Sequence, residues 1–203
     1  MSLITNSLFP IPVLLLNYGA DPTIKTRNGE DALCSACLKM EINTFNYLIK
    51  NVHYTNERIA DAYELMGCSI LDEHKDVKNA LNYWRKALLI RTTSEPKPIV
   101  KQNLVKPKKV YQYVTEFQTS EELASLSTNI DLIRIQSLLI CERILGPENK
   151  NTIFRLMYRG ASHLDNHQYR RCIDLWKYAL ELRIKVMCLK SEFRISLKVN
   201  SIF

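Results

Sequence analysis

The sequence predicts an all-α protein built from helical repeats, and three observations support this fold class. Only 5 of the 203 residues are glycine, about 2.5% against a typical value of about 7%. The 7 prolines leave two long gaps, from Thr23 to Glu95 and from Lys108 to Gly146. Long stretches without these breakers favour helices. A Trp-centred segment also occurs twice, 92 residues apart, as expected of a repeat protein.

The amino-acid composition further narrows the kinds of protein to which this chain can belong. With 46% hydrophobic and 24% charged residues, the chain can bury a core and is not disordered throughout. It has no apolar run long enough for a transmembrane helix, and its start lacks the basic and small-residue features of a signal peptide. The 6 cysteines mostly fall within apolar helical patterns, which predicts reduced, packed thiols and a cytoplasmic or nuclear protein.

The net charge of +7 raises the question of a nucleic-acid partner. The excess is confined to residues 91–110, which carry +5, and 183–203, which carry +4, whereas the rest of the chain is close to neutral. No helix carries a basic stripe, and aromatic residues are not interleaved with basic ones as in RNA-binding platforms. A solvated basic linker and tail are therefore favoured over contacts with nucleic acid or membrane.

The N-terminal part carries the pattern of ankyrin repeats. Leu14–Asp21 (LLLNYGAD) is typical of the end of one repeat, with an apolar helix followed by a Gly turn. Asn28–Cys37 (NGEDALCSAC) stands where a repeat has G-x-T-P-L-H-x-A-A and keeps the turn, the Leu and the small residues. It departs from that consensus at Asp31, Ala32 and Cys34. Because about three repeats are needed for an ankyrin stack to stand alone, this part must lean on the helices that come after it.

The repeated segments are Trp84–Arg91 (WRKALLIR) and Trp176–Arg183 (WKYALELR), which share W-[RK]-x-A-L-x-[IL]-R. Each comes after a shorter apolar helix that holds a glycine, Gly67 or Gly160. Small residues lie four positions before and three after each tryptophan, the pattern of tetratricopeptide helix pairs. We interpret both tryptophans as groove-filling residues rather than as a ligand box, which predicts a loss of about 3–5 kcal/mol on truncating either one.

Three prolines and five lysines mark the first part of residues 92–118 as an exposed basic loop. Thr119 or Ser120 then provides an N-cap for a helix with acidic residues in its first turn. Apolar side chains at helical spacing predict an amphipathic helix over 131–145, ended by Gly146 and the proline after it.

Beyond Lys185 the pattern changes. From Phe193 to Asn200 apolar and polar residues alternate with the period of a strand, yet no other segment offers this strand a sheet. The segment could be an edge peptide for a partner, a membrane-surface contact or, as we favour, a terminus outside the fold.

The sequence holds no G-x-S-x-G, P-loop, G-x-G-x-x-G or H-E-x-x-H signature. Cys34 and Cys37 form one C-x-x-C without the second pair or histidines of a zinc site, in a slot where ankyrin helices need small residues. His163 and His167 could share a helix face as metal ligands, but their segment is typical of a turn between paired helices. Cys141 has no neighbouring histidine to activate it. We therefore expect no catalytic, cofactor or metal site, and no partner-binding residue is assigned.

Five short sequence motifs occur in one order along the chain. This order identifies a protein family more specifically than any one of the motifs does. They are Tyr63–Gly67 (YELMG), Ala80–Ala87 (ALNYWRKA), Cys141–Pro147 (CERILGP), Tyr158–Ala161 (YRGA) and Cys172–Leu180 (CIDLWKYAL). In this order they closely resemble the Fem family, the homologues of the feminization ankyrin-repeat protein. The A-L-x-Y-W-x-K-A string is closer to the branch whose members bind arginine-ended peptides than to its glycine-reading or proline-reading relative.

The resemblance implies a function. Fem proteins are non-catalytic substrate receptors of cullin-RING ubiquitin ligases. Their N-terminal ankyrin array holds a substrate's C-terminal degron, a later box binds elongin and cullin, and other subunits transfer ubiquitin. Most of the array has no counterpart here, and the elongin-binding and cullin-binding segment would lie beyond residue 185. No binding residue is therefore carried over, and the chain is interpreted as an incomplete member.

The predicted organisation has four parts: a non-homologous N-terminus (1–13), terminal ankyrin repeats (14–54), a tetratricopeptide-like helical region (55–185) with the basic loop 92–118, and a divergent tail (186–203). We expect a protein-interaction module of a ubiquitin-ligase substrate receptor, with degron-bearing substrates and the elongin–cullin complex as partners. The alternatives are a stand-alone helical-repeat scaffold and, from another class, nucleic-acid or membrane-surface binding by the basic segments.

Overall fold

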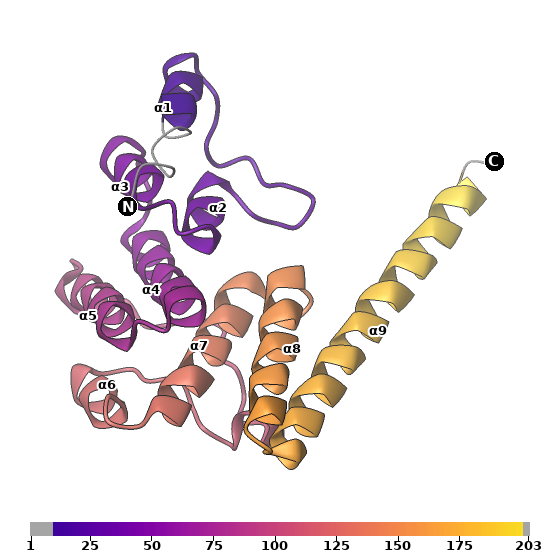
Figure 1. Ribbon diagram of the computed structural model, residues 1–203. Helices are drawn as coiled ribbons and strands as arrows, with labels where there is room; N and C mark the ends of the chain where they lie inside the picture. The colour runs from indigo at the N-terminus through magenta and orange to yellow at the C-terminus, as the bar shows by residue number, and fades with distance from the viewer. Residues whose placement is uncertain (1–9, 201–203) are drawn as a thin grey trace. The chain divides into compact units, whose positions relative to one another are not determined.

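The computed structural model describes the backbone of residues 10–200, and within that range it contains helices and no strand (Figure 1). The predicted all-α class is confirmed. The chain forms two compact units. Unit 1 comprises the chain up to Val105 together with Thr115–Ile144, and unit 2 comprises Lys106–Val114 together with the chain from Leu145 onward. None of the described helices is both long and apolar enough to span a bilayer.

Unit 1 begins with three short helices, α1 (Pro10–Asn17), α2 (Ala32–Leu38) and α3 (Ile42–Asn51). Asp31 is the N-cap of α2, and its carboxylate accepts a hydrogen bond of 2.7 Å from the backbone N–H of Cys34. Asp31 is one of the residues that depart from the ankyrin consensus, and in this chain it serves as the N-cap of α2. Three small residues of α2, Cys34, Ala36 and Cys37, are buried, in agreement with the repeat pattern.

The next two helices, α4 (Asn56–His74) and α5 (Val77–Thr93), pack against each other as a hairpin. Trp84 of α5 is fully buried, and its indole N–H donates a hydrogen bond of 3.0 Å to the carbonyl of Glu64 on α4. A Cβ on Gly67 would lie 2.6 Å from Nε1 of this indole and 2.9 Å from the carbonyl oxygen of Ala80. Only glycine lets the indole and α5 approach α4 this closely.

Unit 1 ends with α6 (Ser120–Leu126) and α7 (Ile130–Leu145). Thr119 is the N-cap of α6, because its hydroxyl accepts a 3.2 Å hydrogen bond from the N–H of Glu122. The predicted helix over 131–145 is confirmed within one residue, and Gly146 has the positive φ of +89° that the predicted cap requires.

Unit 2 contains a second helix hairpin, α8 (Lys150–Asp165) and α9 (Tyr169–Asn200), and the short 3₁₀ turn η1 (Lys109–Tyr111) (Figure 1). The indole N–H of Trp176 donates a 3.0 Å hydrogen bond to the carbonyl of Met157, three residues before Gly160. A Cβ on Gly160 would lie 2.3 Å from Nε1 of the indole. The contact of indole, glycine and carbonyl seen in unit 1 is thus repeated in unit 2.

The two tryptophans nevertheless differ in burial. Trp84 is 0% exposed, whereas Trp176 is 41% exposed. The expectation that each tryptophan fills the groove between its paired helices agrees with both indole contacts, but the equal cost of truncation predicted from it does not follow, because Trp176 is partly exposed. The physical reason lies in unit 1, where the ring of Phe117 lies 5.6 Å from that of Trp84 and covers it.

The basic loop is less solvated than its composition suggests. Its unit 1 part buries Lys101 and Phe117, and Tyr111 is buried in unit 2. In unit 2, Lys108 donates a hydrogen bond to the hydroxyl of Tyr178, and the ring of Tyr111 meets the ring of Tyr178 edge-on at 6.1 Å. The loop is thus divided between the two units, and its residues contribute to the core of each.

The tail also departs from its sequence pattern. The backbone from 186 to Asn200 continues α9, so the strand-like alternation from Phe193 onward does not produce a strand. A lone strand would leave its backbone groups unpaired, whereas a helix pairs them within the segment. Residues 1–9, which include most of the predicted non-homologous N-terminus, and residues 201–203 lie outside the described range.

Because Trp84 is buried and Trp176 is partly exposed, truncating the two tryptophans should lower the free energy of unfolding by different amounts. Trp84→Ala should lower the free energy of unfolding of unit 1 by about 3–5 kcal/mol, because it empties a fully buried site. Trp176→Ala should cost about 1–2 kcal/mol, since a large part of that ring is already exposed. Urea denaturation of the two variants and the wild type measures both values. Equal losses at the two positions would contradict the structure.

Candidate functional site

A largely buried cluster of six charged side chains lies in unit 1, and it was not predicted from the sequence. Three are acidic and three basic, so the cluster is neutral as a whole. The members are Asp61 and Glu64 of α4, Arg91 of α5, Lys101 and Glu116 of the loop, and Arg143 of α7.

Each cation of the cluster contacts more than one carboxylate. Lys101 Nζ lies 2.8 Å from Glu116 Oε1 and 3.2 Å from Glu64 Oε1. Arg143 Nη1 lies 2.8 Å from Asp61 Oδ1, its Nε lies 2.9 Å from Glu116 Oε2, and its Nη2 contacts Glu64. Arg91 Nη2 lies 2.5 Å from Asp61 Oδ1 and 3.4 Å from Glu64 Oε2. The cluster therefore ties the loop and α7 to the α4–α5 hairpin.

At Glu64 and Arg143, attraction between opposite charges outweighs the effect of burial on the pKa. Burial alone would raise the pKa of Glu64, but Lys101, Arg143 and Arg91 outweigh it, and the pKa of Glu64 is lowered. Burial alone would lower the pKa of Arg143, but the three carboxylates around it raise it. Each of the three carboxylates contacts at least two of the three cations. The cluster is a structural joint.

The sequence did hold a signal for part of this cluster. Arg91 lies seven residues after Trp84, which places it on the same face of α5 as a buried residue. Glu64 lies between Tyr63 and Leu65 in an apolar stretch and three residues before Gly67. A charge at a core position predicts a buried partner. The partners themselves lie far along the chain and could not be derived from spacing.

A second joint connects the ankyrin part with the helices after it. Arg58 of α4 contacts both carboxylate oxygens of Asp31, at 2.6 and 2.7 Å. Beside it, Cys37 Sγ lies 3.3 Å from the carbonyl of Ala62 and donates to it. Phe45 of α3 meets the ring of Tyr63 on α4 edge-on, with the ring centroids 5.1 Å apart. The expectation that this part leans on the helices after it is confirmed.

The residues considered as chemical sites occupy structural positions. Cys34 and Cys37 are buried on α2, where burial raises the pKa of the Cys34 thiol to about 12 and that of Cys37 well above its usual value. Cys141 is buried on α7. His163 lies in the last turn of α8, and Nδ1 of this residue is 2.6 Å from Gln168 Oε1.

His167 lies in the turn between α8 and α9, with φ of +57°. Lys75, 92 residues earlier, has φ of +55° in the turn between α4 and α5. The turn interpretation is therefore correct for His167, whereas His163 to Asp165 belong to the last turn of α8. Within the described range, no three or more His, Cys, Asp and Glu side chains gather as metal ligands.

Two helix hairpins with the same indole contact, joined to a terminal ankyrin part, define a protein of the helical-repeat class. Comparison with curated proteins identifies the family. The chain is 39% identical to Protein fem-1 homolog C of Xenopus laevis over 162 residues, which is 76% of this chain and 25% of that protein. It is 36% identical to Protein fem-1 homolog C of Homo sapiens over 173 residues, 84% of this chain and 27% of that one.

A third relative, Protein fem-1 homolog A of Bos taurus, is 40% identical over 132 residues, 64% of this chain and 20% of that protein. The chain matches no family model. These likenesses agree with the resemblance found in the sequence, and the chain belongs to the Fem-1 family. It spans about a quarter of the length of the curated homolog C proteins that it matches.

The cluster predicts that Glu64→Gln is costly. The substitution leaves three buried cations against two carboxylates, and losing one partner of a buried ion pair costs about 3–5 kcal/mol. Glu73→Gln, at an exposed position on the same helix, should change stability by less than about 0.5 kcal/mol. Chemical denaturation at neutral pH measures both. A Glu64→Gln loss as small as that of Glu73→Gln would show that the cluster does not stabilise unit 1.

The pH dependence is set by the direction of the Glu64 pKa. Because this pKa is lower in the folded protein, the Glu64 carboxylate adds stability above the ordinary pKa of a glutamate. That contribution is lost as the pH falls through the lowered folded-state pKa. The wild type and Glu64→Gln should therefore differ most near neutral pH and converge in acid. A difference that grows on acidification would contradict this assignment.

Burial also predicts the reactivity of the six thiols. Five cysteines are buried and Cys188 is exposed. In the native protein at about pH 8, a thiol reagent such as DTNB should modify Cys188 rapidly and Cys34 and Cys37 far more slowly, because their pKa values are raised. All six should react in denaturant. Rapid native-state labelling of Cys34 or Cys37, located by mass spectrometry, would contradict their packed position.

Proposed function

We propose that this chain is a non-catalytic protein-interaction module of a substrate receptor for a cullin-RING ubiquitin ligase. The observation that carries the proposal is membership of the Fem-1 family together with the retained junction between the ankyrin part and the helix hairpins. The sequence resemblance supplies the ligase connection, and the absence of catalytic signatures from the sequence is consistent with a receptor subunit.

The fixed junction suggests how such a module would contribute. Asp31 caps α2 and also contacts Arg58 of α4, so the last ankyrin helices are held in one orientation on the neighbouring hairpin. A receptor has to present its bound substrate at a defined position relative to the ligase. A fixed connection between the ankyrin part and the α4–α5 hairpin serves that purpose. Contribution to C-terminal degron recognition, and through it to proteasomal degradation, belongs to this proposal.

The proposal is tested by expressing the tagged 203-residue chain in cells and identifying the proteins that co-purify by mass spectrometry. If the proposal holds, elongin and cullin co-purify with the chain through contacts made within residues 14–185, since the segment to which the family resemblance assigns this binding would lie beyond residue 185. Circular dichroism of the purified protein controls for folding. A helical, folded chain that brings down neither elongin nor cullin would overturn the proposal and favour a helical-repeat scaffold without a ubiquitin connection.

A further inference from the structure

The chain passes between unit 1 and unit 2 three times, after Val105, after Val114 and after Ile144. At each crossing, a member of the buried ion cluster lies close by along the chain on the unit 1 side. We propose that the cluster is a clamp that holds these three connecting segments together inside unit 1, and that acid opens the clamp and frees unit 2 to move. The inference goes beyond the ubiquitin-ligase proposal and does not depend on it.

The three clamp residues are Lys101, Glu116 and Arg143. Lys101 lies four residues before the first crossing, Glu116 two residues after the second, and Arg143 one residue before Ile144. Their side chains are 1%, 1% and 4% exposed. Each connecting segment is therefore held by a buried charge close to the point where it leaves or enters unit 1.

Glu116 binds the other two clamp residues to each other. Its Oε1 lies 2.8 Å from Lys101 Nζ, and its Oε2 lies 2.9 Å from Arg143 Nε. Lys101 also donates a 2.8 Å hydrogen bond to the carbonyl of Phe117. The first segment is thus tied to the second, and the second is tied to α7, from which the third segment leaves.

The clamp is anchored on α4. Lys101 Nζ lies 3.2 Å from Glu64 Oε1, and Arg143 Nη1 lies 2.8 Å from Asp61 Oδ1. These anchors are ionic, whereas the packing of α5 on α4 is centred on the buried indole of Trp84. Loss of the ionic contacts therefore releases the connecting segments while the hairpin retains its own core.

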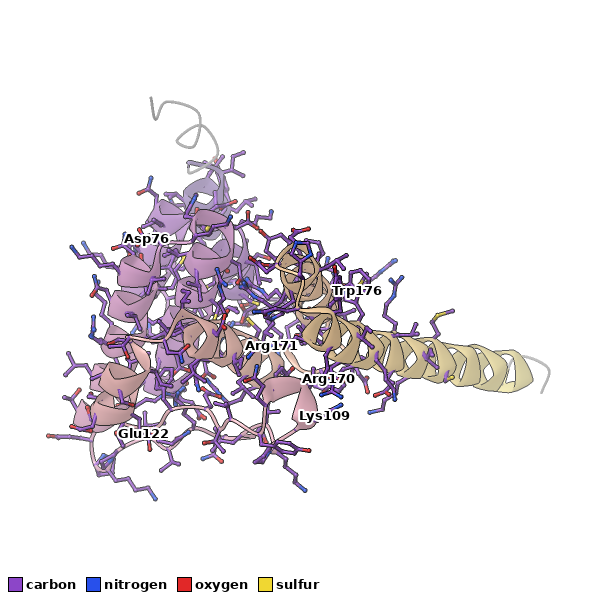
Figure 2. All side chains as sticks on the ribbon, turned by 60° about the horizontal axis from the view of Figure 1, so that its bottom comes forward. Asp76, Lys109, Glu122, Arg170, Arg171 and Trp176 are labelled. Atoms are coloured by element: carbon purple, nitrogen blue, oxygen red, sulfur yellow. The ribbon has the colours of Figure 1, made fainter. Side chains whose placement is uncertain are left out.

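The middle of the basic loop is attached to unit 2. Between the first two crossings, Lys106–Val114 packs on α9, where the buried ring of Tyr111 meets that of Tyr178 edge-on. Lys109 Nζ lies 3.0 Å from Asp174 Oδ1, and Figure 2 labels Lys109 beside the first turns of α9. Because the flanks of this segment are fixed in unit 1 and its middle in unit 2, the loop restrains unit 2 while the clamp is closed.

Acid changes the charge of the clamp, because its carboxylates and cations balance only when all of them are ionised. The groups that face one another are Asp61 and Glu64 from α4, Arg91 from α5, Lys101 and Glu116 from the loop, and Arg143 from α7. Protonation of the carboxylates leaves three cations that repel one another. Burial raises the pKa of Glu64, but the three cations lower it and prevail. The clamp therefore stays closed at neutral pH and opens only below the ordinary pKa of a glutamate, about 4.3.

One uncharged contact persists in acid and determines what moves. Gln136 of α7 accepts a 3.0 Å hydrogen bond from the backbone N–H of Phe117 and donates a 2.9 Å bond to the carbonyl of Thr115. It keeps the second segment on α7. The first segment is released beyond Ile99, whose N–H donates to the carbonyl of Arg91. With the ionic contacts to α4 lost, unit 2 remains joined through α7 alone, and hinge motion becomes possible.

The test measures the spread of distances between the two units. Nitroxide labels are attached at Lys78→Cys on α5 and Lys177→Cys on α9, both exposed positions, with Cys188→Ser to remove the exposed native thiol. Double electron–electron resonance of the full chain gives the distribution of label distances. It should be narrow at neutral pH and at least about twice as wide at about pH 3, while circular dichroism still shows native helix content.

Glu116→Gln opens the clamp without acid, because it removes the carboxylate that binds both Lys101 and Arg143. Its distribution at neutral pH should be as wide as that of the labelled wild type in acid, whereas Glu73→Gln, at an exposed position of α4, should leave the distribution narrow. Should Glu116→Gln fail to fold, the acid titration of the labelled wild type decides. A distribution that is already wide at neutral pH, equal widths in the two folded variants, or widening only together with loss of helix would overturn the proposal.

Discussion

Both helix hairpins depend on one kind of contact, in which the indole of a tryptophan lies directly against the backbone of the neighbouring helix at a glycine. In each pair, the tryptophan lies over a glycine of the neighbouring helix and donates its N–H to a carbonyl of that helix. The glycine permits the approach, and the hydrogen bond fixes the position of the ring. Because the contact sets how the two helices pack, the small residues around each tryptophan are required as well.

The buried ion cluster of unit 1 has a different role. Hydrophobic packing brings α4 and α5 together, whereas the cluster attaches the loop and α7 to them. Lys101 shows how closely the two kinds of contact are combined: its ammonium group contacts Glu64 and Glu116 and also lies 3.8 Å from the ring centroid of Phe117. Phe117 in turn covers Trp84. The burial of the first indole therefore depends on a segment that is held by charge.

Local patterns in the sequence predicted much of this fold. The spacing around Trp84 and Trp176 identified both hairpins, and the caps at Thr119 and Gly146 marked the helix ends correctly. These features are set by residues close to one another along the chain.

What the sequence did not predict depends on contacts between distant segments. Lys101 belongs to a stretch whose composition is typical of an exposed loop, and its burial is caused by carboxylates on α4 and later in the loop. The alternation after Lys185 predicted a strand, but a helix already in progress satisfies the backbone without a partner. The exposed side of Trp176 could not be derived either, since the repeat motif is identical whether or not a further segment covers the ring.

The central claim is that one indole contact occurs twice, covered in unit 1 and open in unit 2. Acrylamide quenching of single-tryptophan variants tests it most directly, with Trp176→Phe leaving Trp84 as the fluorophore and Trp84→Phe leaving Trp176. The structure predicts blue-shifted emission and weak quenching for Trp84, and red-shifted emission with several-fold stronger quenching for Trp176. Equal quenching of the two residues in folded protein would contradict the account.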